Sequence, residues 1–347
     1  MSDLNWKVPR IRRKNLLIVE GNHEKNKLFW LILKSFPEID INMNDIWIYG
    51  TNIYMLYEDI VREYGEEWYD DDIDLPFVIS KKQNYDSIQY KNDFTNIILI
   101  FDYEHHDPKF DEEKILEMQG YFRDSTDMGR LYINYPMIES YQHLTDLPDS
   151  QYENRKISVT LQPGKQYKKM IRNTIVNKSV DFLHKVRDIL ERHYNVSDTA
   201  ICDKCVEEVL EISDASNLRR SIAGKLEGIM AQSDLNTAKY QFEDIILKMG
   251  YIQKGYSYWK YMRNMFQQIV IHNICKANKI QNGKYQISSN EYRSYFDKLD
   301  LEEILYRQNE ISRDSQNGYI WVLSTCVFIV AEYNFSLIQG NIENSTS

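Results

Sequence analysis

The sequence has few cysteines and no long apolar run. Four cysteines occur among 347 residues, and the segment 1–15 ahead of them is polar and basic, unlike a signal peptide. We therefore expect a protein of the reducing cytoplasm. The longest apolar run, residues 319–331, is interrupted by Ser324 and Thr325. It falls short of the roughly 20 apolar residues of a membrane span, so we interpret it as a core helix and expect no membrane partner.

Motifs for nucleotide hydrolysis and for serine catalysis are also missing. The sequence contains no Gly-x-x-x-x-Gly-Lys-Ser/Thr, no Gly-x-Gly-x-x-Gly and no Gly-x-Ser-x-Gly. These patterns cradle nucleotide phosphates or present a nucleophilic serine. The sequence therefore does not predict that this chain hydrolyses ATP or carries a serine triad.

Acidic residues outnumber basic ones, and the formal net charge is -10 at pH 7. This charge argues against a protein that coats nucleic acid by counterion release, so any nucleic-acid contact must be local. The basic runs 10–14 and 165–172 are the candidates for contacts with a nucleic-acid backbone, and solvated faces are the alternative. The 26 tyrosines would suit stacking on bases, but we interpret most of them as packing residues.

The composition and the pattern of apolar residues predict two globular domains. Hydrophobic residues make up 43% and charged residues 27%, which is usual for a soluble protein with a core. The first half alternates short β-branched runs with amphipathic stretches, which predicts an α/β fold with a parallel sheet. Helical patterns dominate the second half. We therefore expect a parallel-sheet domain at residues 1–148 and a mainly α-helical domain, for substrate binding or assembly, at residues 149–347.

The individual elements follow from the same patterns. Strands are predicted at residues 16–19, 46–49, 97–101 and 131–134, and helices at 25–36, 53–64 and 112–121, with a further helix opened by Pro136. In the second half, helices are predicted at residues 180–194, 206–212, 218–231, 238–249, 258–277 and 318–337.

Acidic residues follow two of the predicted strands. In LLIVEGNHEK a strand ends on Glu20, the next residue, Gly21, turns the chain, and a helix carrying Glu24 begins. In IILIFDYEHHD another apolar strand ends on Asp102, and two more acids follow within five residues, Glu104 and Asp107. Ligand sites of open parallel sheets lie outside the carboxyl ends of the strands, so we expect these carboxylates to converge.

Converging carboxylates need a cation. They repel one another unless a hard cation joins them, and Mg²⁺, or Mn²⁺ in its place, accepts carboxylate, water and phosphate oxygens. The alternative is that Glu20 and Asp102 cap helices and bind no metal. Glutamate is a poor cap, however, and capping leaves Glu104 and Asp107 unexplained.

These residues resemble the motifs of the Toprim family. The first motif of that family is a glutamate after a strand, followed by glycine, and the second is an Asp-x-Asp pair after a later strand. Here they are Glu20 with Gly21, and Asp102 with Glu104. The resemblance covers about residues 15–144 and departs at Glu104, whose side chain is one methylene longer than the usual aspartate.

The Toprim resemblance implies further site residues. Glu139 is similar to the later acid that some Toprim nucleases use to complete a second metal site; a surface helix acid is the alternative. The resemblance implies that Glu20, Asp102 and Glu104 are catalytic, with Glu20 as a metal ligand or a proton carrier. The implied metal-binding residues are Glu20, Glu24, Asp102, Glu104, Asp107 and Glu139. His105 and His106 would steer phosphate or carry protons, unless they are simply exposed.

Toprim domains occur in topoisomerases, primases and nucleases, so the family alone does not determine which reaction the chain catalyses. Other features of the sequence must distinguish these classes. The chain shows neither the large additional domain of a topoisomerase nor the zinc-ribbon and helicase-contact regions of a primase. Its organisation resembles stand-alone Toprim effectors of bacterial anti-phage and abortive-infection systems, such as the effector of PARIS, the second protein of AbiL and OLD-like nucleases. This implies a Mg²⁺-dependent nuclease acting on DNA or RNA, with a separate ATPase sensor as partner. The sequence leaves open whether the chain forms a homo-oligomer. The alternative is a non-catalytic module that binds metal, nucleotide or a partner protein.

A second group of residues has the spacing of a zinc site. Cys202 and Cys205 are three positions apart, as are His272 and Cys275. Two such pairs would supply four tetrahedral zinc ligands. The second pair lies on a predicted amphipathic helix that would bury a cysteine anyway, and no glycine knuckle follows the first pair. We expect ordinary buried thiols, with structural zinc as the alternative.

Overall fold

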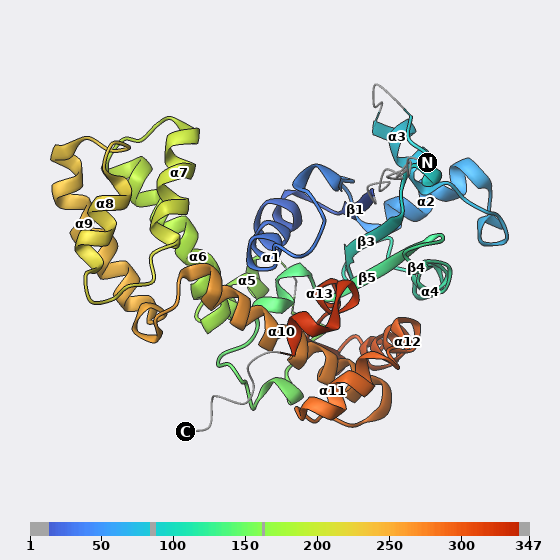
Figure 1. The fold of residues 1–347 in the computed structure, drawn as a ribbon. Helices are drawn as coiled ribbons and strands as arrows, with labels where there is room; N and C mark the ends of the chain where they lie inside the picture. Colours follow the sequence, from blue (N-terminus) through green and yellow to red (C-terminus); the bar gives the residue numbers. More distant parts are fainter. Residues whose placement is uncertain (1–13, 84–87, 162–163, 340–347) are drawn as a thin grey trace, which may run out of the picture.

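A mainly parallel sheet lies at the centre of the protein (Figure 1). Within residues 14–83, 88–161 and 164–339, which the computed structural model describes, six strands form this sheet in the order β2-β1-β3-β5-β4, with β8 also paired to β5. The neighbours β2, β1, β3 and β5 are parallel, whereas β4 and β8 run antiparallel to β5. The strands are β1 (Asn15–Val19), β2 (Ile46–Ile48), β3 (Asn96–Asp102), β4 (Arg123–Asp124), β5 (Gly129–Tyr135) and β8 (Leu323–Ser324).

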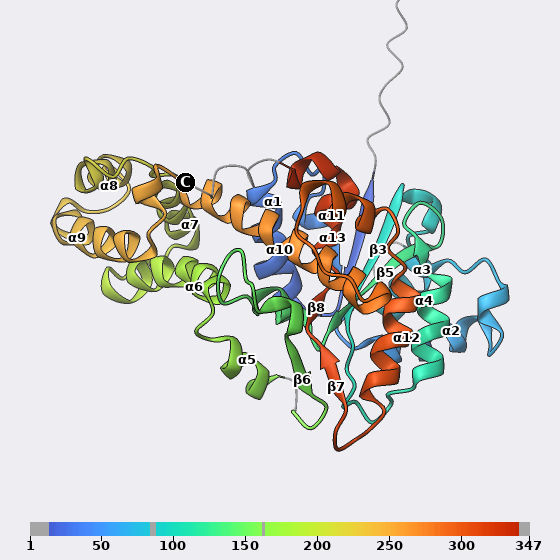
Figure 2. The ribbon, with the colours of Figure 1, turned by 90° about the horizontal axis from the view of Figure 1, so that it is seen from below.

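The central strands are buried on both faces. Every residue of β1 is buried, and so is every residue of β3 after Asn96. Continuous apolar runs of this kind occur where helices cover both sides of a parallel sheet. Figures 1 and 2 place α2 (Ile53–Tyr64) and α4 (Glu112–Tyr121) on one side, and α1 (Trp30–Ser35), α10 (Tyr258–Asn282) and α13 (Phe328–Tyr333) on the other. The expected α/β class with a parallel sheet is therefore confirmed.

The helices of the first half begin and end where local signals place them. The side chain of Asn52 accepts a hydrogen bond from the backbone N–H of Met55 and caps α2, and Asp111 caps α4 in the same way. The predicted helix after Pro136 is wrong: a short 3-10 turn, η5 (Ile138–Gln142), stands there. The helices are α1 (Trp30–Ser35), which continues a π-helical turn η1 (Glu24–Phe29), α2 (Ile53–Tyr64), α3 (Leu75–Gln83) and α4 (Glu112–Tyr121).

Helices dominate the second half. Three of them, α7, α8 and α9, form a lobe that projects away from the sheet and joins the rest through α6 and α10 (Figure 1). Among the residues that the structure describes, no helix has the length and apolar character needed to span a bilayer. The helices are α5 (Lys165–Ile171), α6 (Ile175–Asp188), α7 (Thr199–Leu210), α8 (Leu218–Leu226), α9 (Gln232–Met249), α10 (Tyr258–Asn282), α11 (Ser289–Phe296), α12 (Leu301–Ser312) and α13 (Phe328–Tyr333).

The predicted core helix at residues 318–337 is wrong over its first part. This stretch forms the strand β7 (Tyr319–Trp321) and then β8, and only afterwards the short helix α13. Aromatic and β-branched residues favour strands where a partner strand is present. β7 pairs with β6 (Lys156–Ser158) in a separate two-stranded ribbon, and β8 pairs with β5. The division at residue 148 stays a prediction, but the central sheet takes a strand from beyond it.

A buried asparagine joins three of these segments. Asn273 on α10 is fully buried, and its Oδ1 accepts hydrogen bonds from the Tyr152 hydroxyl and from the backbone N–H of Ser324, both at 2.7 Å. Its Nδ2 donates to the Ile269 carbonyl. The asparagine therefore ties β8 and the segment before β6 to the longest helix.

Replacing Asn273 by alanine tests this connection. Two buried donors would lose their acceptor, so we expect the free energy of unfolding to fall by about 2 kcal/mol or more in urea denaturation. Asn282→Ala, at the exposed end of the same helix, is the matched control. Equal stability of the two variants would contradict the role given to Asn273.

Candidate metal centre

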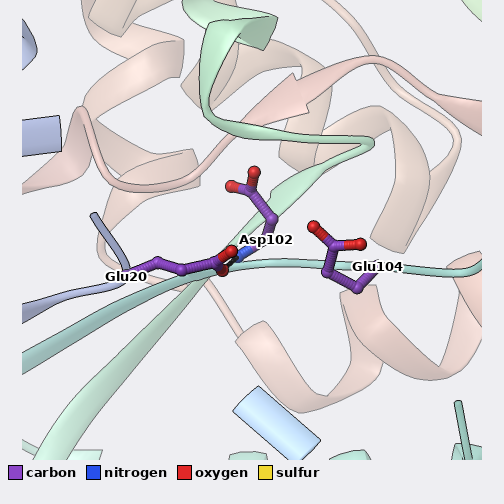
Figure 3. A group of neighbouring side chains, drawn as sticks. All are labelled: Glu20, Asp102 and Glu104. Atoms are coloured by element: carbon purple, nitrogen blue, oxygen red, sulfur yellow. Dashed lines mark hydrogen bonds between the residues drawn. The ribbon is translucent and has the colours of Figure 1, made fainter. Parts of the chain in front are cut away.

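Three carboxyl groups meet at the carboxyl edge of the sheet (Figure 3). Glu20 directly follows β1, Asp102 is the last residue of β3, and Glu104 lies two positions further on. Each offers a carboxylate oxygen, and these oxygens all lie within 4.8 Å of one another. The three residues brought together are the ones that the sequence predicts as the centre of the site.

The pairing of the strands explains this convergence. β1 and β3 are parallel neighbours with Val19 opposite Ile100, so Glu20 emerges beside the end of β3. The backbone N–H of Asp102 points to Oε2 of Glu20 at an N···O distance of 3.5 Å. Asp102 itself is only 5% exposed, which places its carboxyl group at the bottom of the site.

Glu104 has a strained backbone. Its φ is 47°, in the left-handed region, and the backbone N–H of Asp107 donates to its carbonyl at 2.8 Å. For a residue with a Cβ atom, this backbone conformation is less favourable than the right-handed one by roughly 1 kcal/mol or more. Such strain is concentrated at functional sites, where the surrounding structure holds the residue in place. The turn directs the longer side chain of Glu104 toward the other two carboxyl groups.

A cavity of about 260 Å³ surrounds the three carboxyl groups. Residues from the turn after β1, from η1, from the end of β3 and the loop after it, from η5 and from α5 enclose it. Its lining is formed by Glu20, Gly21, Asn22, His23, Glu24, Asp102, Glu104, Met137, Ile138, Glu139 and Lys168.

Glu24 closes the turn after β1. Its Oε2 accepts a hydrogen bond from the backbone N–H of Gly21 at 2.8 Å. A Cβ atom on Gly21 would lie 3.2 Å from that same oxygen, tighter than most such contacts. A glycine at this position therefore lets the buried carboxyl group of Glu24 approach the backbone. Glu24 lines the cavity, but it is not one of the three clustered acids.

Glu139 occupies the opposite wall with a cation beside it. Its side chain is only 2% exposed, and Nζ of Lys168 lies 2.8 Å from its Oε1. Nδ1 of His23 lies 3.5 Å from the same oxygen. Among the described residues, Oε2 of Glu139 has no hydrogen-bond partner. Glu139 thus reaches the cavity from the start of η5, where the sequence predicts a possible second metal ligand.

Burial and mutual repulsion raise the pKa values of Glu20, Asp102, Glu104 and Glu24. Loss of solvent, followed by the charges of Glu104 and Glu24, raises the pKa of Glu20 to about 8. Burial and then the charge of Glu20 raise the pKa of Asp102 well above its usual range. The pKa values of Glu104 and Glu24 are also raised, again mainly by burial. A bound divalent cation would reverse this effect, because it favours the ionised carboxylates.

Other predicted site residues lie outside the cluster. Both carboxyl oxygens of Asp107 are engaged, one by the side chain of Asn52 and one by the backbone N–H of Lys109. His105 packs against aromatic rings, and burial lowers its pKa. His106 is exposed, with Nε2 at 3.1 Å from the Leu161 carbonyl. None of the three lines the cavity, so Asp107 is a loop-ordering residue in this arrangement.

The alternative zinc site is not formed. Cys202 and Cys205 are buried on α7 in the projecting lobe, whereas His272 and Cys275 lie on α10. Both ring nitrogens of His272 are engaged, by the backbone N–H of Asp149 and by the Tyr285 hydroxyl. Within residues 14–83, 88–161 and 164–339, the only cluster of three or more potential metal ligands is the acidic one at the sheet edge.

Sequence reasoning missed three features of the site. The sequence gives His23 no role in the site, but it contacts Glu139, and burial lowers its pKa against the opposing effect of that acid. Lys168 was assigned only to a basic run. Asn134, one residue before the end of β5, lies opposite Asp102 and is fully buried, and its Oδ1 accepts a hydrogen bond from the Ser324 hydroxyl. The position of Asn134 near the end of a third predicted strand is the sequence feature that could have pointed to it.

Comparison with protein-family models, curated proteins and solved structures finds no match to this chain. The resemblance to the Toprim family therefore depends on the motif residues alone.

The pH dependence of stability tests the repulsion within the cluster. The pKa of Glu20 is about 8 in the folded protein, above the 4.5 of an ordinary glutamate. Ionisation therefore favours the unfolded chain as the pH rises from 4.5 to 8. We expect the melting temperature of the metal-free protein to fall over this interval. Glu20→Gln should melt higher at the alkaline end, by about 2 to 4 °C for each kcal/mol of relieved repulsion.

The control for this measurement is Glu66→Gln, which changes an exposed loop acid and should leave the pH profile as it is. A Glu20→Gln protein that melts below wild type at every pH would identify Glu20 as a structural cap.

Proposed function

We propose that the protein is a metal-dependent nuclease. Its active site, formed by Glu20, Asp102 and Glu104, hydrolyses phosphodiester bonds of nucleic acid. The observation that supports this most strongly is the close approach of three carboxylate oxygens, within 4.8 Å of one another, at the ends of adjacent parallel strands. Carboxyl ends of parallel strands are where open α/β sheets place their ligand sites.

The donor set fits a hard divalent cation. All three clustered ligand atoms are carboxylate oxygens, which suit Mg²⁺ or Mn²⁺ better than thiolate-binding metals. Asp102 and Glu104 would hold the ion, and Glu20 would ligate it or transfer a proton. A bound Mg²⁺ or Mn²⁺ would polarise the scissile phosphate and stabilise charge on the leaving oxygen.

Cationic side chains beside the cluster suit an anionic substrate. Lys168 reaches the cavity from α5, and a phosphate oxygen would compete with Glu139 for its ammonium group. On and just after the same helix, Lys165, Lys169 and Arg172 are exposed and form no ion pair with any residue that the structure describes. The basic run 165–172 thus borders the acidic site. Of the other basic run, residues 10–13 lie outside the described residues.

The biological setting is part of the same proposal. The resemblance of the motif residues to Toprim effectors supports an anti-phage or abortive-infection nuclease that works with a separate ATPase sensor. The alternative is a non-catalytic module that uses the acidic cavity to bind metal, nucleotide or a partner. Cleavage assays on plasmid, single-stranded DNA and total tRNA separate the two, since only the nuclease degrades a substrate.

Variants of the cluster test the nuclease directly. Glu20→Ala and Glu104→Gln should each reduce Mg²⁺-dependent cleavage by about 100-fold or more, because each removes a carboxylate that would hold the ion beside the scissile phosphate or transfer a proton. Glu104→Asp keeps the charge but shortens the arm, and the strict octahedral geometry of Mg²⁺ should make it slower than wild type yet faster than Glu104→Gln.

Asp70→Asn, in an exposed acidic loop, is the matched control and should cleave as wild type does. Full activity in Glu104→Gln would remove Glu104 from the ligand set. The absence of cleavage by wild type, alone and with its ATPase partner, would favour the binding module.

A further inference from the structure

The two-stranded ribbon of β6 and β7 carries two aromatic rings on one face. Lys156 is paired with Trp321, and Ser158 with Tyr319. The residues between them, Ile157 and Ile320, are buried, whereas Tyr319 and Trp321 are partly exposed. Side chains alternate across a strand, so both rings stand on the outer face.

The ribbon extends from the same edge of the sheet as the acidic cluster. β7 continues through Val322 into β8, and β8 pairs with Asn134 and Tyr135 at the carboxyl end of β5. Asn134 is in turn opposite Asp102. Because β8 is antiparallel to β5, the chain before it lies beyond that end of the sheet, where Figure 2 places β6, β7 and α5 together.

The residues that directly follow β6 lie beside the loop that follows β3. After β6, the carbonyl of Leu161 lies 3.1 Å from Nε2 of His106 in the loop that follows β3. α5 then brings Lys168 to Glu139 in the wall of the cavity. A strand of nucleic acid that passes from the cluster along α5 would therefore approach the ribbon.

The two rings are held in place. Their centroids are 5.3 Å apart in an edge-to-face arrangement. Below Trp321, Nζ of the buried Lys276 lies 4.3 Å from the ring. The side chain of Gln308 accepts from the backbone N–H of Trp321 and donates to its carbonyl, so the free edge of β7 is closed. The rings thus need little ordering when a ligand binds.

A positive charge accompanies the rings. Nζ of Lys156 lies 3.7 Å from the centroid of the Tyr319 ring, and Lys156 forms no ion pair with any of the described residues. The ammonium group lies over one face of the Tyr319 ring, so a base that stacks there displaces it toward the phosphate. Stacking is also the interaction that a protein of net charge -10 can use, since it does not depend on a large positive field.

We propose that Tyr319, Trp321 and Lys156 bind unpaired bases of the nucleic-acid strand that is cut, so that the substrate is single-stranded next to the cleaved bond. The proposal rests on the nuclease function above and adds the substrate class. In a duplex, the bases stack on one another and their faces are covered, so exposed rings select unpaired bases. Single-stranded DNA and single-stranded RNA share this chemistry.

Binding is measured by fluorescence anisotropy with labelled DNA and RNA strands of about 15 nucleotides and with their duplexes. The proteins carry Asp102→Asn, so that the strands stay intact. We expect single strands to bind about ten-fold or more tightly than duplexes, and Tyr319→Leu to weaken single-strand binding about ten-fold without affecting duplex binding. Tyr319→Phe, which keeps the ring, should bind as the parent does.

Tyr240→Leu is the matched control, because Tyr240 is an exposed tyrosine that, like Tyr319, has positive charge near its ring, but it lies on α9 in the projecting lobe. Melting temperatures confirm that each variant is folded; Trp321 is left unchanged because it covers Lys276. Equal affinity for single strands and duplexes, or unchanged binding by Tyr319→Leu, would overturn the proposal. So would the absence of nucleic-acid binding, and a protein partner would then be the occupant of the ribbon.

The two proposals fail separately. Metal-dependent cleavage by the wild-type protein, with binding that is insensitive to Tyr319, would overturn the ribbon proposal and retain the nuclease. Conversely, loss of single-strand binding in Tyr319→Leu, with no cleavage by wild type under any divalent metal, would retain the ribbon and overturn the nuclease.

Discussion

The geometry of the site depends on the parallel pairing of β1 with β3. Backbone hydrogen bonds hold Val19 opposite Ile100, so both strands end at one edge and Glu20 comes beside Asp102. Burial removes the water that would screen the two carboxyl groups, and the pKa values of both rise. The sheet must therefore hold them together against an unfavourable interaction, and the strained turn at Glu104 adds to it. A bound divalent cation would relieve the repulsion between these carboxyl groups.

The second half of the chain completes this site. α5 supplies Lys168, which neutralises Glu139, and β8 extends the sheet beside β5, where the Ser324 hydroxyl bonds Asn134. The ribbon of β6 and β7 extends from the same edge of the central sheet. A cation from the mainly helical half thus lines the cavity that holds the carboxyl groups from the sheet.

The sequence predicted the parts of the fold and site that local signals determine. The apolar runs of β1 and β3 and the caps of α2 and α4 are local, and the strand-end position of Glu20 and Asp102 follows from them. Lys168 and His23 were missed as partners of Glu139, because their contacts depend on how distant segments pack. The strand β7 was read as helix, since a short apolar run fits both until its partner strand is known. The cysteine and histidine pairs have zinc-like spacing, but tertiary structure keeps both nitrogens of His272 occupied.

Calorimetric titration of Mn²⁺ into the metal-free protein at neutral pH, in buffers of different ionisation enthalpy, tests the metal centre most directly. Metal binding releases the protons of its ligands, and the pKa of Glu20 lies near 8. We expect saturable binding that releases about one proton or more, with both the binding and the proton release lost in Asp102→Asn. No binding by wild type, or the same affinity in Asp102→Asn, would contradict a metal site at these carboxylates.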